Sequence, residues 1–175
     1  MKLSDGVEWG VHATTLLAVL PPDRALPAAK LAEYHGVPAA RLAEYHDVPS
    51  AYLAKHLQAL AGAGVLETVK GPRGGYRLAR PPAEITVLDV VEAIDGDEPA
   101  FRCSEIRRRG PAAVPARDYK LPCGIHRAFT RADAAWRKEL EKTTIANLVV
   151  GVIQEAPPSA VDKAARWLGE AVRVV

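Results

Sequence analysis

The chain has 175 residues, with 23 lysines and arginines against 21 aspartates and glutamates, and a formal net charge of +2. This length supports one domain, or one domain with an appendage, and the balanced charge excludes binding of nucleic acid through bulk positive charge. No basic-then-apolar leader opens the chain, and no apolar run approaches the roughly 20 residues of a membrane span, so we expect a cytoplasmic protein with no membrane partner. Its two cysteines then indicate free, metal-binding or redox-active thiols.

Apolar residues at helical spacing predict a first helix over residues 7–20, which Pro21 and Pro22 end. An eleven-residue duplication follows, because AAKLAEYHGVP at 28–38 is repeated as AARLAEYHDVP at 39–49. The first helix of a helix-turn-helix precedes the recognition helix by a short turn, so we assign that role to the second copy. The first copy is then an insertion, in which Gly36 and Pro38 predict a separate short helix.

Residues 48–80 indicate a recognition helix followed by a basic hairpin. Ser50 can cap a helix whose buried face carries Leu53, Leu57 and Leu60, and glycines at 62 and 64 end it. Two strands are predicted over 65–69 and 76–78, joined by a glycine-rich turn at 71–75. This order predicts a winged helix-turn-helix. Its cations, against Glu67 alone, favour double-stranded DNA as the partner; they are Lys55, Lys70, Arg73, Arg77 and Arg80.

The predicted DNA contacts lie on the recognition helix and the wing. Lys55 and Gln58 are the best candidates for reading base edges, while Tyr52 could equally anchor the helix to the core. Cations on the wing can approach phosphates or a narrow minor groove. The full set of predicted DNA-binding residues is Ser50, Tyr52, Lys55, His56, Gln58, Lys70, Arg73 and Arg77.

A short helix over 85–94 completes a predicted DNA-binding domain at residues 1–96. Residues 97–124 hold both cysteines without periodicity and predict a loop. In residues 125–175, apolar positions at 125, 129, 132, 136 and 140 predict a long helix that packs lengthwise on a second copy, and two further helices are expected to extend that dimer interface. The predicted fold is mainly α with a small β wing: a winged helix-turn-helix domain plus a long dimerisation helix.

Four residues suggest a metal centre. Glu8 and His12 are four positions apart on a predicted helix, so their side chains share a face and, with Cys103 and Cys123, make four ligands. A 2Fe–2S cluster needs four protein ligands, and nitrogen or oxygen donors on one iron raise its potential. A zinc site with the same ligands, an inert pair of thiols and a reversible disulfide stay open. His126, soon after Cys123, is a reserve ligand.

These motifs resemble the winged-helix iron-sulfur and redox transcription regulators of the IscR/NsrR family. The resemblance covers roughly residues 1–150 and is carried by the MKLS start, the stretch from LAEYHDVPSAYLAKH to VVEAIDG, the cysteine loop and the long helix. The duplication is foreign to the family pattern, and its three closely spaced cysteines are absent. Glu8, Trp9 and His12 with two distant cysteines are instead similar to the RsrR type.

The resemblance implies a homodimeric repressor whose 2Fe–2S cluster changes affinity for a DNA operator. It implies Cys103 and Cys123 as ligands from one subunit and Glu8 and His12 from the other. Because Trp9 lies beside both helix ligands, we hypothesise that it acts as a redox relay. Trp9 could equally fill the dimer seam. A zinc- or thiol-based regulator on the same fold and a metal-free module that binds protein are the alternatives. We expect no enzyme, because KGPRGGY lacks the ending of a phosphate-binding loop and no Gly-x-Ser-x-Gly or His-Glu-x-x-His motif occurs.

Overall fold

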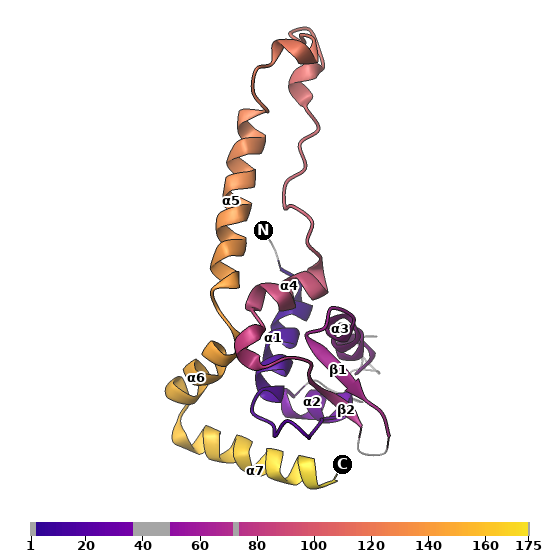
Figure 1. Cartoon of the computed structure of the whole chain (residues 1–175), viewed down its shortest axis with the longest axis vertical. Coiled ribbons are helices and arrows are strands. Elements are labelled where there is room, and N and C mark those ends of the chain that lie inside the picture. Colours follow the sequence, from indigo (N-terminus) through magenta and orange to yellow (C-terminus); the bar gives the residue numbers. More distant parts are fainter. Residues whose placement is uncertain (1–2, 37–49, 72–73, 175) are drawn as a thin grey trace.

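The computed structural model describes residues 3–36, 50–71 and 74–174 and consists of a helical body, a two-stranded wing and a projecting stalk (Figure 1). This arrangement confirms the predicted fold class. We call residues 3–95, as far as they are described, the winged domain, and residues 96–141 the stalk. The elements are α1 (Asp5–Leu17), α2 (Ala28–Tyr34), α3 (Ser50–Gly62), β1 (Leu66–Val69), β2 (Gly75–Leu78), η1 (Pro82–Glu84), α4 (Val87–Asp95), η2 (Ile106–Arg108), η3 (Ala116–Asp118), α5 (Gly124–Glu141), α6 (Ile145–Glu155) and α7 (Pro158–Val174).

Aliphatic side chains form the core of the winged domain. On α3, Leu53, Leu57 and Leu60 recur at helical spacing and are at most 2% exposed. Each such side chain stabilises the fold by about 1.5–3 kcal/mol relative to an exposed one. Further fully buried side chains are Leu26, Leu31, Val65, Leu66, Ile85, Val90 and Ile145. The recognition helix α3 is therefore fixed along one side and free along the other.

The wing is tied to the segment before α2. Strands β1 and β2 are antiparallel, and Leu26 adds a bridge in which its N–H and carbonyl bond Tyr76 at 3.0 and 2.8 Å. Gly75 has a φ of 155°, and a Cβ there would lie 2.6 Å from the backbone nitrogen of Pro27. Only glycine therefore allows this approach of the two backbones.

The first copy of the duplicated sequence forms α2. Leu31 and Ala32 are at most 1% exposed, because α2 packs against α3. The first copy is thus part of the core and not an insertion outside it, since its apolar residues have the spacing that docking on α3 requires. The second copy, to which we assigned this role, lies outside the described residues.

The chain returns from the stalk into the winged domain. Thr86 caps α4 by accepting a 3.1 Å hydrogen bond from the N–H of Asp89, and Thr144 caps α6 in the same way. The N–H of Ile145 donates to the carbonyl of Ile85 at 2.8 Å, and Ile145 is fully buried. Helix α6 therefore packs within this chain, on α1 and η1, whatever a dimer adds.

The stalk consists of α5 and a loop that runs alongside it in the opposite direction (Figure 1). Phe101 of the loop stacks on Phe129 of α5, with ring centroids 4.5 Å apart. At the base, Arg137 of α5 pairs with Glu92 of α4 and donates to the carbonyl of Asp97 at 2.6 Å. Every residue of the stalk is described and none is buried. In the described ranges, no helix is long and apolar enough to cross a membrane.

Candidate metal and DNA-binding sites

The two cysteines meet at the start of α5, which is the end of that helix that lies away from the winged domain (Figure 1). Cys103 precedes η2, Cys123 is the N-cap of α5, and both thiols are free and half-buried. The backbone N–H groups of His126 and Ile125 in the first turn of α5, and then the thiol of Cys103, lower the pKa of Cys123. The two thiols, which are twenty positions apart in the sequence, thus lie within hydrogen-bonding reach of each other.

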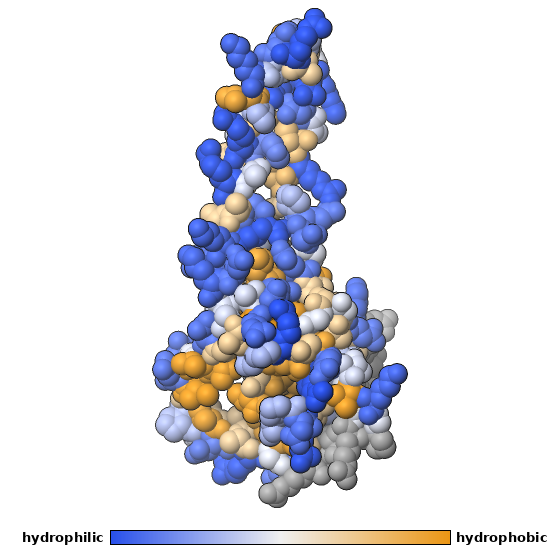
Figure 2. Space-filling view, in the orientation of Figure 1, coloured by the Kyte–Doolittle hydropathy of each residue, from blue (hydrophilic) through white to orange (hydrophobic). Residues whose placement is uncertain are grey.

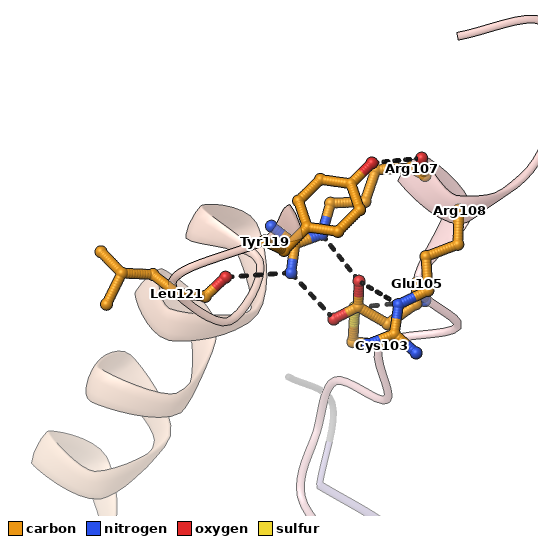
Figure 3. Close-up of polar contacts among 6 residues, drawn as sticks. All are labelled: Cys103, Glu105, Arg107, Arg108, Tyr119 and Leu121. Carbon is orange, nitrogen blue, oxygen red and sulfur yellow. Dashed lines mark hydrogen bonds and ion pairs between the residues drawn. The ribbon is translucent and has the colours of Figure 1, made fainter. Parts of the chain in front are cut away.

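A set of contacts that we call the arginine clasp, made by Glu105, Arg107, Tyr119 and Leu121, closes this loop (Figure 3). The guanidinium of Arg107 donates to the Glu105 carboxylate at 2.7 Å and to the Leu121 carbonyl at 3.1 Å. The hydroxyl of Tyr119 donates to the Arg107 carbonyl at 2.7 Å, and the guanidinium lies 4.1 Å from the Tyr119 ring centroid. One arginine therefore joins the segment after Cys103 to the segment before Cys123.

Glu105 connects the clasp to both cysteines, through the Cys103 sulfur and the backbone N–H of Cys123. Its backbone is left-handed, with a φ of 50°, which directs its N–H to the Cys103 sulfur at 3.4 Å. The hydrogen bond from Arg107, the charges of Arg107 and Arg108 and the N–H of Cys123 lower the pKa of the Glu105 carboxyl. Sequence reasoning missed this residue because its partners lie in a segment without periodicity. The run at 107–109 signalled only positive charge.

Glu8 and His12 are exposed, one turn apart on α1. The His12 ring lies 5.6 Å from the ring of His35, at the end of α2. Burial, and then the charge of His12, lowers the pKa of His35 to about 4. Trp9, between the two predicted ligands, is half-buried and packs against the core. The helix thus turns a carboxylate and an imidazole outward and the indole inward.

Within one chain, the structure does not bring the four predicted ligands together. The thiols lie at the start of α5, and α1 lies in the winged domain (Figure 1). Among the residues that the structure describes, no three histidine, cysteine, aspartate or glutamate side chains are placed to hold a metal ion. The predicted ligands therefore form two separate pairs on different elements.

An apolar groove lies beside His12. It has a volume of about 540 Å³ and is lined by side chains of α1, α2, α6, α7 and the residues after α1 and α2, among them Val19, Val152 and Ile153. These three aliphatic side chains are 44–54% exposed. Figure 2 shows hydrophobic side chains gathered over α6. One member of the outward-facing pair on α1 thus borders an uncovered apolar surface.

The predicted DNA-reading side chains are partly exposed. Lys55 and Gln58 extend from the outer face of α3, and Lys70 is exposed at the end of β1. Tyr52 is half-buried, with its ring edge-on to His56 at 4.4 Å, which agrees with an anchoring contribution. The side chain of Ser50, and Arg73 as a whole, lie outside the described part of the chain.

Two of the residues predicted to contact DNA, His56 and Arg77, make contacts within the protein. His56 is 7% exposed and packs against Gly6 of α1, which corrects its assignment to the DNA-facing surface. It follows Leu53 by three positions and precedes Leu60 by four, so the helical period itself turns it inward. Arg77 pairs with Glu67 and donates to the carbonyl of Pro22 at 3.0 Å, so its guanidinium also fastens the wing.

Residues 3–151 match the model of the Rrf2 family, described as an iron-dependent transcriptional regulator. Protein aau3 of Rhizobium meliloti (strain 1021) is 40% identical over 95 residues, which are 54% of this chain and 58% of that relative, so the chain spans less than two thirds of the relative's length. Several solved structures share the fold. Two of them are CymR, the global cysteine regulator of B. subtilis (TM-score 0.62, 19% identity, 86% of this chain and 97% of that one), and IscR of T. potens (TM-score 0.60, 21% identity, 92% and 96%).

Proposed function

This chain belongs to the Rrf2 family of transcriptional regulators, and we propose that it is a homodimeric repressor whose DNA affinity follows the oxidation state of a 2Fe–2S cluster. The observation that carries this proposal is the division of the candidate ligands. Two thiols meet at the start of α5, and a carboxylate and an imidazole face outward from α1. Because neither pair is completed by the described residues of its own chain, each fits the role of half a site that a second copy completes.

The donor set suits such a cluster. Cys103 and Cys123 lie close enough to bind one iron, and the lowered pKa of Cys123 favours its thiolate form. Glu8 and His12, one turn apart, supply oxygen and nitrogen for the other. When bound, the cluster supplies a one-electron couple, which these harder ligands place at a higher potential than four thiolates would. The arginine clasp holds the thiols together before any metal arrives.

The exposed apolar surfaces support a dimer. Ile125 and Phe129, on the cysteine-bearing half of α5, are 62% and 51% exposed. The apolar groove beside His12 is likewise left uncovered by the described residues. If the stalk of one copy packs along the winged domain of the other, both surfaces are buried and the thiols approach α1 of the second copy. Trp9, packed between α1 and the core, is then placed to relay a change at the cluster toward α3.

On the DNA side, the exposed set supplies the contacts. Lys55 and Gln58 read base edges or phosphates from the major groove, and Lys70 contacts phosphate from the wing. Ser50, Tyr52, Arg73 and Arg77 complete the proposed surface. We expect Lys70→Ala to weaken binding to all sequences alike and to lower the salt slope by about 1. Loss confined to one sequence would contradict a phosphate contact.

The cluster is tested by anaerobic purification, an iron and sulfide count and a visible spectrum. The proposal requires iron and sulfide in equal amounts and a visible absorption that Cys103→Ala removes. A colourless protein that binds zinc through the same residues would replace the cluster with a zinc site. A colourless, metal-free protein would favour the thiol-based regulator, for which the proximity of Cys103 and Cys123 is the supporting observation.

Complementation tests the sharing of ligands between subunits. One variant carries Glu8→Gln and His12→Ala, the other Cys103→Ala and Cys123→Ala, and each alone should be colourless. Dimers formed from both contain one complete site, so reassembly of the mixture should restore colour to about half of the dimers. No colour after reassembly, with mixed dimers detected by tags, would argue that each chain binds its own metal.

A further inference from the structure

Helix α1 lies so close to α3 that the residue at their crossing has no space for a side chain. A Cβ at Gly6 would lie 2.6 Å from Nε2 and 2.8 Å from Nδ1 of His56, distances that real Cβ atoms essentially never show. The helix dihedrals of Gly6 are ordinary, so the glycine is required by this approach and not by its backbone conformation. The contact between α1 and α3 is therefore made by a glycine against an imidazole ring.

The imidazole of His56 is held by packing. It is 7% exposed, and its Nε2 has no hydrogen-bond partner in the described ranges. The ring of Tyr52, one turn earlier on α3, meets it edge-on at 4.4 Å. Burial lowers the pKa of His56, followed by the charge of Lys55, so the ring is neutral near pH 7. A neutral ring without a hydrogen bond to α1 transmits displacement through its shape alone.

The same stretch of α1 carries the outward-facing pair. Glu8 follows Gly6 by two positions, and Gly10 makes a second close contact, because a Cβ there would lie 3.3 Å from Cγ1 of Val90 on α4. At the start of α1, the N–H of Ser4 donates to the carboxylate of Asp95 at 2.9 Å. The helix is thus pressed onto α3 and α4 along one face while Glu8 and His12 occupy the other.

We infer that His56 is a positioning residue, through which the place of α1 sets the place of the DNA-reading helix α3. A displacement of α1 at Glu8 moves Gly6 against the His56 ring. Because the ring is densely packed, it can yield only by moving together with α3. Lys55 and Gln58, on the exposed side of α3, then move relative to the wing. The inference rests on the proposed function only for what displaces α1; the contact itself requires no metal.

Four variants test it: Gly6→Ala, His56→Ala, the double variant, and Gly62→Ala as a matched control in open space at the other end of α3. Binding to a labelled duplex of the region upstream of the protein's own gene is measured by anisotropy, with the melting temperature of each variant. Gly6→Ala should weaken binding about 10-fold, and the double variant should recover to within about 3-fold of wild type, as expected for residues in direct contact. The control should bind as wild type.

Equal DNA affinity for folded Gly6→Ala and wild type would overturn the inference, and so would a double variant no better than Gly6→Ala. If Gly6→Ala does not fold, the unmodified protein decides: the NMR signal of the His56 ring should shift when DNA binds, although the ring is buried, and an unchanged signal overturns the inference. A colourless protein with these couplings would end the cluster proposal alone. A coloured protein without them would end this inference alone.

Discussion

The winged domain and the stalk are stabilised in different ways. The winged domain buries aliphatic side chains of α1–α4 and the wing, joined by Ile145 of α6 and Ala171 of α7, and Leu31, Leu57 and Ile145 are fully inaccessible. The stalk has no buried residue, and its contacts are polar or between partly exposed rings. The arginine clasp at one end and the ion pairs of Arg137 at the other hold it in shape.

This contrast indicates which part of the molecule benefits from the proposed dimer. Exposed ion pairs in water contribute about 0–1 kcal/mol each, whereas a buried leucine contributes several times more. The winged domain can therefore be stable within one chain, whereas in the proposed dimer the stalk gains stability where the second copy covers Ile125 and Phe129.

In the winged domain, Leu57→Ala should lower the free energy of unfolding by about 2–5 kcal/mol, because it leaves a cavity in the core between α3 and its neighbours. Urea unfolding followed by circular dichroism measures this loss. Ile125→Ala, in the exposed stalk, is the matched control. Equal destabilisation of the two variants at a concentration where the protein is monomeric would remove the contrast.

In the stalk, Phe129→Ala should act on association. We expect the dimer to weaken by about 2 kcal/mol, roughly 30-fold in Kd, because a partly exposed aromatic ring that a partner covers is a typical binding hot spot. Analytical ultracentrifugation over a concentration series measures it. If the variant dimerised as tightly as wild type but had a lower free energy of unfolding, the Phe129 ring would contribute only to the internal packing with Phe101.

Opening the arginine clasp should affect the thiols. Arg107→Met removes the bonds to Glu105 and to the Leu121 carbonyl, and we expect metal affinity at the cysteines to fall by about 10–100-fold, as for other residues that orient ligands. Competition with a coloured chelator for cobalt measures the affinity. Arg127→Met, on exposed α5, serves as control. Arg107→Lys should not recover the loss, since one ammonium cannot reproduce the fork.

The two regions should also differ in pH dependence. The pKa of His35 is lowered from its ordinary 6.5 to about 4, so its contribution to the stability of the metal-free protein is present above pH 6.5 and is lost as the pH falls toward 4. The pKa of Glu105 lies below its ordinary 4.5, so the clasp persists until the pH falls below that value. As the pH falls from 7 to 4.5, the free energy of unfolding should therefore decrease in the wild-type protein and decrease less in His35→Gln. An identical pH profile for the two proteins would contradict this.

Periodicity predicted most of the winged domain. The spacing of Leu53, Leu57 and Leu60, with the glycines that follow, predicted α3 and the wing within a residue or two. The stepping of apolar residues likewise predicted α5. The helical period of these leucines also places His56 on the buried face of α3. Its polar side chain favours an exposed position, but its place three residues after Leu53 turns it inward.

Periodicity could not predict the arginine clasp or the docking of α2. Glu105, Arg107 and Tyr119 are joined through backbone carbonyls and a left-handed turn, which leave no repeating pattern in the sequence. The two copies of the duplicated segment have nearly identical residues, so composition cannot tell which one docks on α3. Only the tertiary structure, in which Leu31 is fully buried, identifies the first copy as part of the core.

The bridge between Thr86 and Thr144 has a mechanical consequence. The chain leaves the winged domain where α4 ends and returns beside Thr86, where α4 begins. Both ends of the stalk are therefore attached to the winged domain at α4. Adding or removing helical turns in the stalk would change its length without changing this attachment. Distance to a target on another molecule could thus be adjusted in this architecture independently of the surface that meets DNA.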